Sequence, residues 1–261
     1  MPVFRPDWLT SRPIAHRGLH NKEQRIIENS ATAARLAIEQ QCAIECDVQI
    51  SADGEAIVFH DFTLERLTKA QGRVDSLDAR ALSALTLADS QDHPLPLSEF
   101  CALIGKRTPL ICEIKSRFDG DMRLAERTAA IAKAYAGPMA LKSFDPQIIA
   151  HLHKNRLPLG IRYLPLGVVA MADYGSQADE AEGDIHLDDQ ARYRLAHFLH
   201  YRESMPDFLS YCVQDMPHAV PFLCRYGIGL PVMAWTVKTE QDWANARQWA
   251  DQAIFEGEIR R

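Results

Sequence analysis

The chain has 261 residues, of which 47% are apolar and 25% are charged, as is ordinary for a globular protein. At roughly 100–200 residues per domain, this length is enough for one large domain with a sizeable core. The formal net charge is -6, and nucleic-acid binders usually carry a basic face, so nucleic acid is not the expected partner. An anionic substrate would therefore need a local source of positive charge.

The sequence also argues against membrane and secreted classes. No stretch approaches the roughly 18 consecutive apolar residues of a membrane span, so we expect no stable insertion into a membrane. The first residues lack a basic patch followed by an apolar run, so we expect no signal peptide and a cytoplasmic location. The six cysteines form no CxxC pair, so we interpret them as reduced core residues. The oligomeric state is left open.

Short apolar runs alternate with helix-like segments along the chain. We predict eight strands, at Pro13–His16, Ala43–Ile50, Leu110–Ile114, Met139–Ser143, Leu159–Tyr163, Phe208–Val213, Val232–Val237 and Ala253–Glu256. Strands that alternate with helices imply a parallel sheet. Eight repeats in about 250 residues predict a (β/α)₈ TIM barrel. An open doubly wound sheet is the alternative.

Helical periodicity and start signals predict the helices between these strands. A helix begins after Asn29 or Ser30, either of which can cap it. Asp145 and Pro146 begin another helix, with proline at its first position. Further helices are expected at Leu124–Tyr135, Asp188–Tyr201, Met216–Tyr226 and Thr239–Trp249.

Three segments do not fit a regular repeat. Residues 61–109 are too many for a simple loop, so we predict an insertion after the second strand, near the catalytic face of a single domain 1–261. The segment Met1–Ser11, with Phe4 and Trp8, is expected to cover the barrel floor or an exposed flank. We interpret the loop Gly167–Asp184 as a lid or a mobile segment.

Ionisable residues gather at the ends of the first predicted strands. The first strand ends in His16 and Arg17, and arginine binds phosphate in two-point contacts. In the second strand, side chains alternate between faces, so Glu45 and Asp47 share one face. The outer face of a barrel strand packs on helices, so the two carboxylates should point inward. Ion pairs to Arg or Lys, or a divalent cation, can offset their burial.

The next segments add a second histidine and a third carboxylate. The Asp53–Gly54 turn predicts a hairpin that brings His60 back over the carboxylates. Glu113 and Lys115 share one face of the third predicted strand. A lone histidine at a strand end is more often structural, but the carboxyl ends of barrel strands form the catalytic face.

The whole set is chemically coherent. Three carboxylates can hold one divalent cation, Mg²⁺ or Ca²⁺. That cation, Arg17 and Lys115 would neutralise a phosphate group. His16 and His60 would supply an acid and a base for cleavage of a phosphodiester. The cation also provides the local positive charge that an acidic protein needs for an anionic substrate.

Five motifs in this order resemble the glycerophosphodiester phosphodiesterase family. They are His16-Arg17-Gly18, Glu28-Asn29, Glu45-x-Asp47, His60-Asp61 and Glu113-x-Lys115. The resemblance is strong over residues 13–116 and continues more weakly to the C-terminus. It implies a (β/α)₈ barrel that hydrolyses a small-molecule glycerophosphodiester to glycerol 3-phosphate and an alcohol.

The resemblance also implies roles for the matching residues. It makes His16 and His60 the acid/base pair, and it makes Glu45, Asp47 and Glu113 the metal ligands. It makes Arg17 and Lys115 the phosphate-binding residues and places Glu28 and Asn29 in the substrate site. Apart from the resemblance, we expect Trp235 to contact the substrate. Glu28 and Asn29 would orient His16 or shape the pocket, and Trp235 is either a wall of the glycerol pocket or a core aromatic residue.

The sequence departs from the family pattern in three places. Ile27 stands where proline usually precedes the Glu-Asn pair. Lys142 stands where the family often has a small residue, and it would either pair with Glu113 or contact the phosphate. Phe255-Glu256-Gly257 replaces the usual Thr-Asp pair, so the far wall of the pocket differs and the head-group preference is left open.

Two other functions remain as alternatives. One is a lyase of the phospholipase D-like or phosphoinositide type, which releases a cyclic phosphate as its final product. The other is a barrel that binds a phosphorylated ligand without turnover. In related barrels a hydroxyl of the substrate attacks phosphorus, and the sequence does not assign which histidine is the acid and which is the base.

Overall fold

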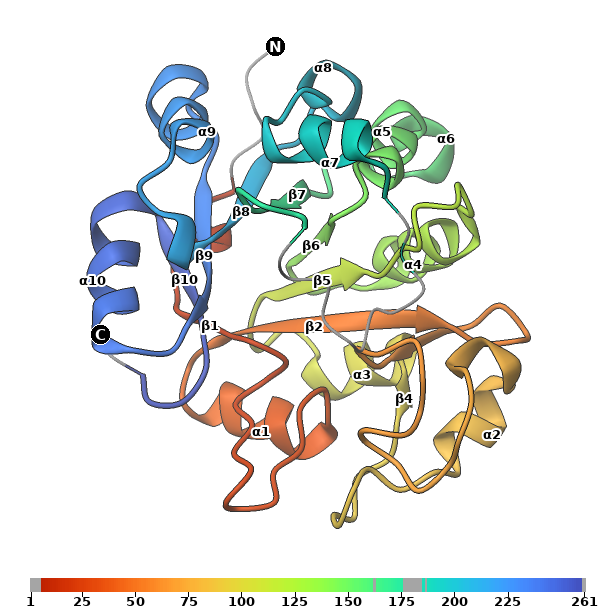
Figure 1. Ribbon diagram of the computed structural model, residues 1–261. Helices are drawn as coiled ribbons and strands as arrows, with labels where there is room; N and C mark the ends of the chain where they lie inside the picture. Colours follow the sequence, from red (N-terminus) through yellow and green to blue (C-terminus); the bar gives the residue numbers. More distant parts are fainter. Residues whose placement is uncertain (1–5, 162, 176–184, 186, 260–261) are drawn as a thin grey trace.

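The computed structural model describes residues 6–161, 163–175, 185 and 187–259, which build a closed parallel barrel surrounded by helices (Figure 1). The barrel strands, in chain order, are β1 (Ile14–Ala15), β2 (Ala43–Ile50), β5 (Leu110–Ile114), β6 (Met139–Ser143), β7 (Leu166–Ala170), β8 (Phe208–Cys212), β9 (Val232–Val237) and β10 (Gln252–Phe255). β1 pairs in parallel with both β2 and β10, which closes the barrel. The predicted (β/α)₈ fold is confirmed.

Helices follow the barrel strands and form the outer layer. They are α1 (Ala31–Glu39), α3 (Leu97–Ile104), α4 (Arg123–Ala134), α5 (Pro146–Lys154), α6 (Arg156–Leu159), α7 (Asp189–Ala196), α8 (Tyr201–Ser204), α9 (Ala219–Phe222) and α10 (Glu240–Trp249). Ser30 caps α1, Asp145 caps α5 and Thr239 caps α10, each by accepting a bond from a backbone N–H group. Among the helices of the described residues, none is long and apolar enough to cross a bilayer.

The predicted fifth strand, Leu159–Tyr163, is wrong. Leu159 ends α6, and Gly160 closes that helix with a φ of 71° in the left-handed region. The strand lies instead at β7, where Leu166 pairs with Leu141 of β6. A short apolar run is compatible with a buried helix end as well as with a strand, so periodicity alone misplaces it. Residues 167–170 of the segment interpreted as a lid or mobile loop belong to strand β7. Residues 176–184 of that segment lie outside the described residues.

Two predicted helices are interrupted. The helix expected at Asp188–Tyr201 divides into α7 and α8 because Phe198 has a φ of 57°, which a right-handed helix cannot include. The helix expected at Met216–Tyr226 begins later, as α9, and continues as a π-helical segment, Leu223–Ile228.

The long segment after β2 builds a small structure of its own. β3 (Ala56–Val58) returns antiparallel beside β2 and pairs with β4 (Leu95–Pro96), and α2 (Ala79–Ser83) lies between them in sequence. A separate group of buried apolar side chains holds this segment together: Ile57, Phe59, Leu64, Leu67, Val74, Leu82 and Leu87. The hairpin of β2 and β3 therefore carries the chain back toward His60, as the sequence predicts.

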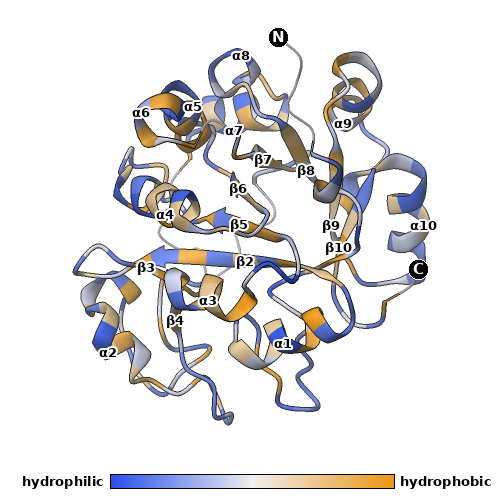
Figure 2. Cartoon of the chain, turned by 180° about the vertical axis from the view of Figure 1, so that it is seen from behind, coloured by the Kyte–Doolittle hydropathy of each residue, from blue (hydrophilic) through white to orange (hydrophobic). Residues whose placement is uncertain are grey.

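The barrel interior is apolar at its floor and polar above it. Seven strand residues and one residue from the N-terminal segment form the floor: Leu9, Ile14, Ala43, Ile111, Ala140, Phe208, Met233 and Ile254. Half-buried Trp8 packs against these residues. The N-terminal segment therefore covers the floor, which is one of its two expected positions. Phe4 lies outside the described residues. In Figure 2, hydrophilic and hydrophobic colours alternate along β2, which matches its inward carboxylates and outward apolar side chains.

All six cysteines are buried, and none lies in a disulfide: Cys42, Cys46, Cys101, Cys112, Cys212 and Cys224. They occur in strands, helices or the residues beside them and pack within the hydrophobic core. The structure therefore supports their interpretation as core residues.

Leu9 is only 2% exposed and closes the barrel floor. We expect Leu9→Ala to lower the free energy of unfolding by about 2–4 kcal/mol, because it leaves a cavity under the barrel. Chemical denaturation measures this, with exposed Asp7→Ala as the control, for which we expect a change within about 0.5 kcal/mol. Equal stability of the two variants would show that the N-terminal segment does not seal the floor.

Candidate active site

A cavity of about 550 Å³ lies at the carboxyl ends of the barrel strands. Most of the residues that the sequence singles out line it: His16, Arg17, Glu28, Asp47, His60, Glu113, Lys115 and Trp235. The hairpin after β2 and the loops after the other strands surround the cavity. It therefore occupies the face where a parallel barrel carries its functional residues.

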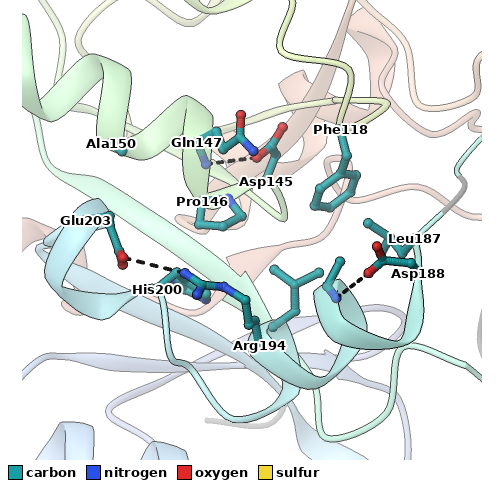
Figure 3. A pocket seen from close by; sticks show the side chains of 12 residues that line it. Phe118, Asp145, Pro146, Gln147, Ala150, Leu187, Asp188, Arg194, His200 and Glu203 are labelled. Carbon is teal, nitrogen blue, oxygen red and sulfur yellow. Dashed lines mark hydrogen bonds and ion pairs between the residues drawn. The ribbon is translucent and has the colours of Figure 1, made fainter.

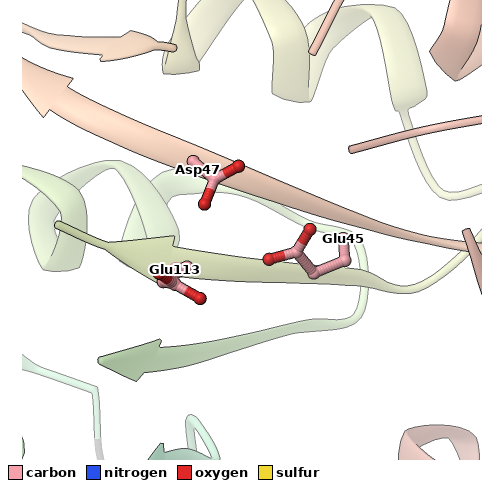
Figure 4. A group of neighbouring side chains, drawn as sticks. All are labelled: Glu45, Asp47 and Glu113. Atoms are coloured by element: carbon pink, nitrogen blue, oxygen red, sulfur yellow. The ribbon is translucent and has the colours of Figure 1, made fainter. Parts of the chain in front are cut away.

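Three carboxylates form the centre of this site. Glu45 and Asp47 lie on β2, and Glu113 lies opposite Asp47 on the neighbouring strand β5. Figure 4 shows their side chains converging from the two strands, and each offers an oxygen atom within 4.8 Å of the others. All three are buried, with exposed fractions of 0%, 1% and 4%. Buried, all-oxygen donor sets of this kind suit a hard divalent cation.

Two lysines neutralise the carboxylates from within the barrel. Lys115 Nζ lies 2.7 Å from Glu113 Oε1 and 3.1 Å from Asp47 Oδ1. Lys142 Nζ lies 2.9 Å from Glu113 Oε2 and 3.0 Å from Glu45 Oε1. Of the two alternatives for Lys142, the ion pair with Glu113 is therefore present. Buried charges need such partners, because each loses its hydration.

These ion pairs determine the protonation of the cluster. Burial alone would raise the pKa of Glu113, but the charges of Lys115 and Lys142 outweigh burial and lower that pKa to about 2. Burial likewise opposes ionisation of Asp47, yet Lys115 and the other nearby cations hold its pKa well below the ordinary value. Burial would lower the pKa of Lys142, and the carboxylates raise it instead. Asp47 and Glu113 are therefore ionised and Lys142 is charged at neutral pH.

The Arg17 and Glu28-Asn29 motifs hold the carboxylates in place. The Arg17 backbone N–H donates to Glu45 Oε2 at 3.0 Å, and its guanidinium donates to Glu28 Oε1 at 2.6 Å. Asn29 donates from Nδ2 to Asp47 Oδ2 at 3.0 Å, and its Oδ1 accepts from the Asp47 backbone N–H at 3.2 Å. Asn29 is 2% exposed, so its amide orients Asp47.

Each histidine is held by a carboxylate. His16, directly after β1, has Nδ1 at 2.7 Å from Glu256 Oε1. His60 has Nδ1 at 2.7 Å from Asp61 Oδ1. Such a contact fixes the orientation of the ring and leaves its Nε2 atom outside that bond. Burial alone would raise the pKa of Glu256, but the bond from His16 and the charges of His16 and Lys238 lower it below the ordinary value.

The sequence does not indicate the part that Arg66 plays in the site, nor the contact of Glu256 with His16. Glu256 is expected only as a residue of the far wall of the pocket. Arg66, from the segment after β3, donates to Asp61 Oδ2 at 2.6 Å and to Glu28 Oε1 at 2.7 Å. Burial would raise the pKa of Glu28, and the bonds from Arg66 and Arg17 lower it to about 2. Arg66 thus joins the insertion to the Glu28-Asn29 motif.

Aromatic side chains form the opposite wall of the cavity. Trp235, on β9, packs edge to face against Phe144, with ring centroids 5.4 Å apart at an angle of 85°. Both residues line the cavity. Trp235 also packs against the apolar floor, so its position fits both alternatives, a cavity wall and a core aromatic residue. His20 also lines the cavity, with Nε2 3.9 Å from Glu256 Oε1.

Residues 16–257 match the model of the glycerophosphoryl diester phosphodiesterase family. The chain belongs to this family. A curated relative from Caldanaerobacter subterraneus subsp. tengcongensis, named a glycerophosphodiester phosphodiesterase, is 32% identical over 102 residues. That match covers 39% of this chain and 37% of the relative. It therefore spans just over a third of the relative's length.

Solved structures of family members share the fold. A phosphodiesterase from Oleispira antarctica, in complex with the product sn-glycerol-3-phosphate, has a TM-score of 0.72 at 19% identity, over 95% of this chain and 94% of that chain. A glycerophosphodiester phosphodiesterase from Thermotoga maritima has a TM-score of 0.68 at 20% identity, over 93% and 92% of the two chains. At these identities the similarity establishes the barrel fold.

A second cavity, of about 330 Å³, lies between α5 and the segment of α7 and α8 (Figure 3). His200 lines it and is only 4% exposed. Its Nδ1 lies 3.2 Å from Ser204 Oγ, and its Nε2 has no hydrogen-bond partner among the described residues. Burial lowers the pKa of His200 to about 4, which the charge of Glu203 offsets only in part. His200 is therefore neutral in the folded protein.

We expect this histidine to make folding stability depend on pH. Between about pH 6.5 and 4, the unfolded chain binds a proton at His200 that the folded chain does not, so stability falls as the pH falls. The full loss is up to about 3 kcal/mol. Chemical denaturation across this range measures it, and His200→Gln should flatten the dependence whereas exposed His197→Gln should not. If the free energy of unfolding changed equally with pH in the wild type and in both variants, His200 would not be the source of this dependence.

Glu256 provides a test of the site around His16. Glu256→Ala should lower kcat for phosphodiester cleavage by about 10- to 100-fold with a smaller change in KM, because His16 loses its orienting partner. Glu256→Gln keeps an acceptor oxygen and should recover part of the loss. Lys238→Met removes the ion pair between Lys238 and Glu256 Oε2 and serves as the control. Turnover of Glu256→Ala within twofold of wild type would argue against a positioning role.

Proposed function

We propose that this chain is a divalent-cation-dependent phosphodiesterase that hydrolyses glycerophosphodiesters to glycerol 3-phosphate and an alcohol. The observation that carries the proposal is one cavity lined by two carboxylate-held histidines, the cations of Arg17 and Lys115, and two of three clustered buried carboxylates. Family membership supports this class of reaction. The Oleispira antarctica relative, solved with sn-glycerol-3-phosphate, supports a small glycerol phosphate as the ligand.

The metal site would consist of Glu45, Asp47 and Glu113. Their buried oxygen atoms fit Mg²⁺ or Ca²⁺, since both ions prefer carboxylate ligands. A bound cation would act as a Lewis acid that polarises a phosphoryl oxygen. Asn29 would keep Asp47 in position for this role through its two hydrogen bonds.

Arg17 and Lys115 would bind the phosphate group of the substrate. Both side chains line the cavity beside the carboxylates and carry positive charge. Glu28 holds the Arg17 guanidinium at 2.6 Å, which limits its motion. Pre-positioned cations stabilise the charge that grows on the phosphoryl oxygens in the transition state. Trp235 would form a wall beside the glycerol moiety.

The two histidines would transfer the protons. The Nε2 atom of one histidine takes the proton from the glycerol 2-hydroxyl, whose oxygen attacks phosphorus and closes a cyclic phosphate. The other histidine protonates the alkoxide oxygen as the bond from phosphorus to the alcohol breaks. Water then opens the ring to give glycerol 3-phosphate. Glu256 and Asp61 keep the two rings oriented through their Nδ1 atoms.

We expect His16→Ala and His60→Ala each to lower turnover by about 10²–10⁴-fold without unfolding the barrel. Release of glycerol 3-phosphate from glycerophosphocholine and glycerophosphoethanolamine measures this, with EDTA and then with Mg²⁺ or Ca²⁺ restored. Exposed His93→Ala is the matched control, and circular dichroism reports folding. Wild-type turnover in either active-site variant would contradict the role given to that histidine.

Product analysis separates hydrolysis from the lyase alternative. Phosphorus NMR of the reaction mixture should show glycerol 3-phosphate as the final product. A cyclic phosphate that accumulates and persists would assign the lyase reaction instead. Tight binding of the diester with no bond cleavage in the presence of either metal ion would assign a binding protein.

A further inference from the structure

Lys142 reaches two of the three carboxylates that form the proposed metal site. It lies on β6, where it pairs in register with Glu113 of β5, and it is 2% exposed. Its Nζ lies between Glu45 Oε1, at 3.0 Å, and Glu113 Oε2, at 2.9 Å. The ammonium therefore bridges oxygen atoms that come from different strands, on two of the three carboxylates that would hold the cation.

The remaining oxygen atoms of these carboxylates also have partners. Glu45 Oε2 accepts the backbone N–H of Arg17 at 3.0 Å. Lys115 Nζ contacts Glu113 Oε1 at 2.7 Å and Asp47 Oδ1 at 3.1 Å. Lys142 thus contacts the one Glu45 oxygen that Arg17 does not use.

Positive side chains already face these carboxylates. Glu45, Asp47 and Glu113 contact the cationic groups of Lys115, Lys142 and Arg17 at 3.4 Å or less, and Arg17 also pairs with Glu28. A divalent cation would add two further positive charges to this group. Held by the same carboxylates, it would lie close to the Lys142 ammonium, and like charges repel strongly in a buried site.

We propose that Lys142 is an internal counter-ion that competes with the divalent cation for Glu45 and Glu113. Metal binding then requires the ammonium to leave these oxygen atoms, so Lys142 weakens the affinity for the metal. Without the metal, the same ion pairs hold the carboxylates together. This inference rests on the proposed metal site and adds a residue that sets its affinity.

Lys142→Met tests the competition, because methionine has a similar length and no charge. Titration with Mn²⁺, followed by the electron paramagnetic resonance of the free ion, gives the dissociation constant without any substrate. We expect the variant to bind one Mn²⁺ at least about tenfold more tightly than wild type, which corresponds to about 1.4 kcal/mol. Calorimetric titration with Mg²⁺ and Ca²⁺ should show the same order.

Lys238→Met is the matched control. Lys238 lines the same cavity, but its Nζ pairs with Glu256 Oε2 at 2.9 Å and not with the proposed ligands. We expect its affinity for Mn²⁺ to stay within about twofold of wild type, because the charge it removes is screened by solvent. Adding Glu45→Gln to Lys142→Met should abolish the gain in Mn²⁺ affinity, since Lys142 competes with the cation for the Glu45 carboxylate.

Affinities of Lys142→Met and wild type within twofold would overturn the inference, and so would weaker binding by the variant. If Lys142→Met does not fold by circular dichroism, Lys142→Gln provides the same test with a shorter neutral side chain. Metal-dependent turnover with unchanged affinity would refute only the role of Lys142. Turnover in EDTA, with no Mn²⁺ bound by either protein, would refute the metal site and this inference together.

Discussion

The active site depends on the burial of three carboxylates inside a barrel. Glu45, Asp47 and Glu113 have almost no contact with solvent, and ionised groups in such a place are stable only with close partners of opposite charge. Lys115 and Lys142 supply these partners. The apolar floor below the cluster and the wide cavity above it therefore meet at a layer of ion pairs.

The register of three neighbouring strands sets the composition of this layer. Asp47 on β2 lies opposite Glu113 on β5, and Glu113 lies opposite Lys142 on β6. The histidines flank this row, His16 from the end of β1 and His60 from the hairpin that continues β2. Carboxylates from outside the row, Glu256 and Asp61, orient them. The charged layer and the two histidines thus lie beside one another at one cavity.

The sequence predicts those parts of the site that follow from local patterns. Alternation along β2 and β5 places Glu45, Asp47 and Glu113 on the inner face, because strand side chains alternate regardless of the rest of the fold. The strand expected at Leu159–Tyr163 was wrong, since a short buried apolar run has no decisive period. The contact of His16 with Glu256 joins residues 240 positions apart, and local patterns carry no information on such pairs.

The most direct test of the metal site is diffraction from crystals grown with Mn²⁺, recorded at the manganese absorption edge. We predict one anomalous peak at bonding distance from oxygen atoms of Glu45, Asp47 and Glu113, with the Lys142 ammonium displaced from Glu45. Absence of a peak at these carboxylates, in crystals of a protein that is fully active in EDTA, would contradict the metal site.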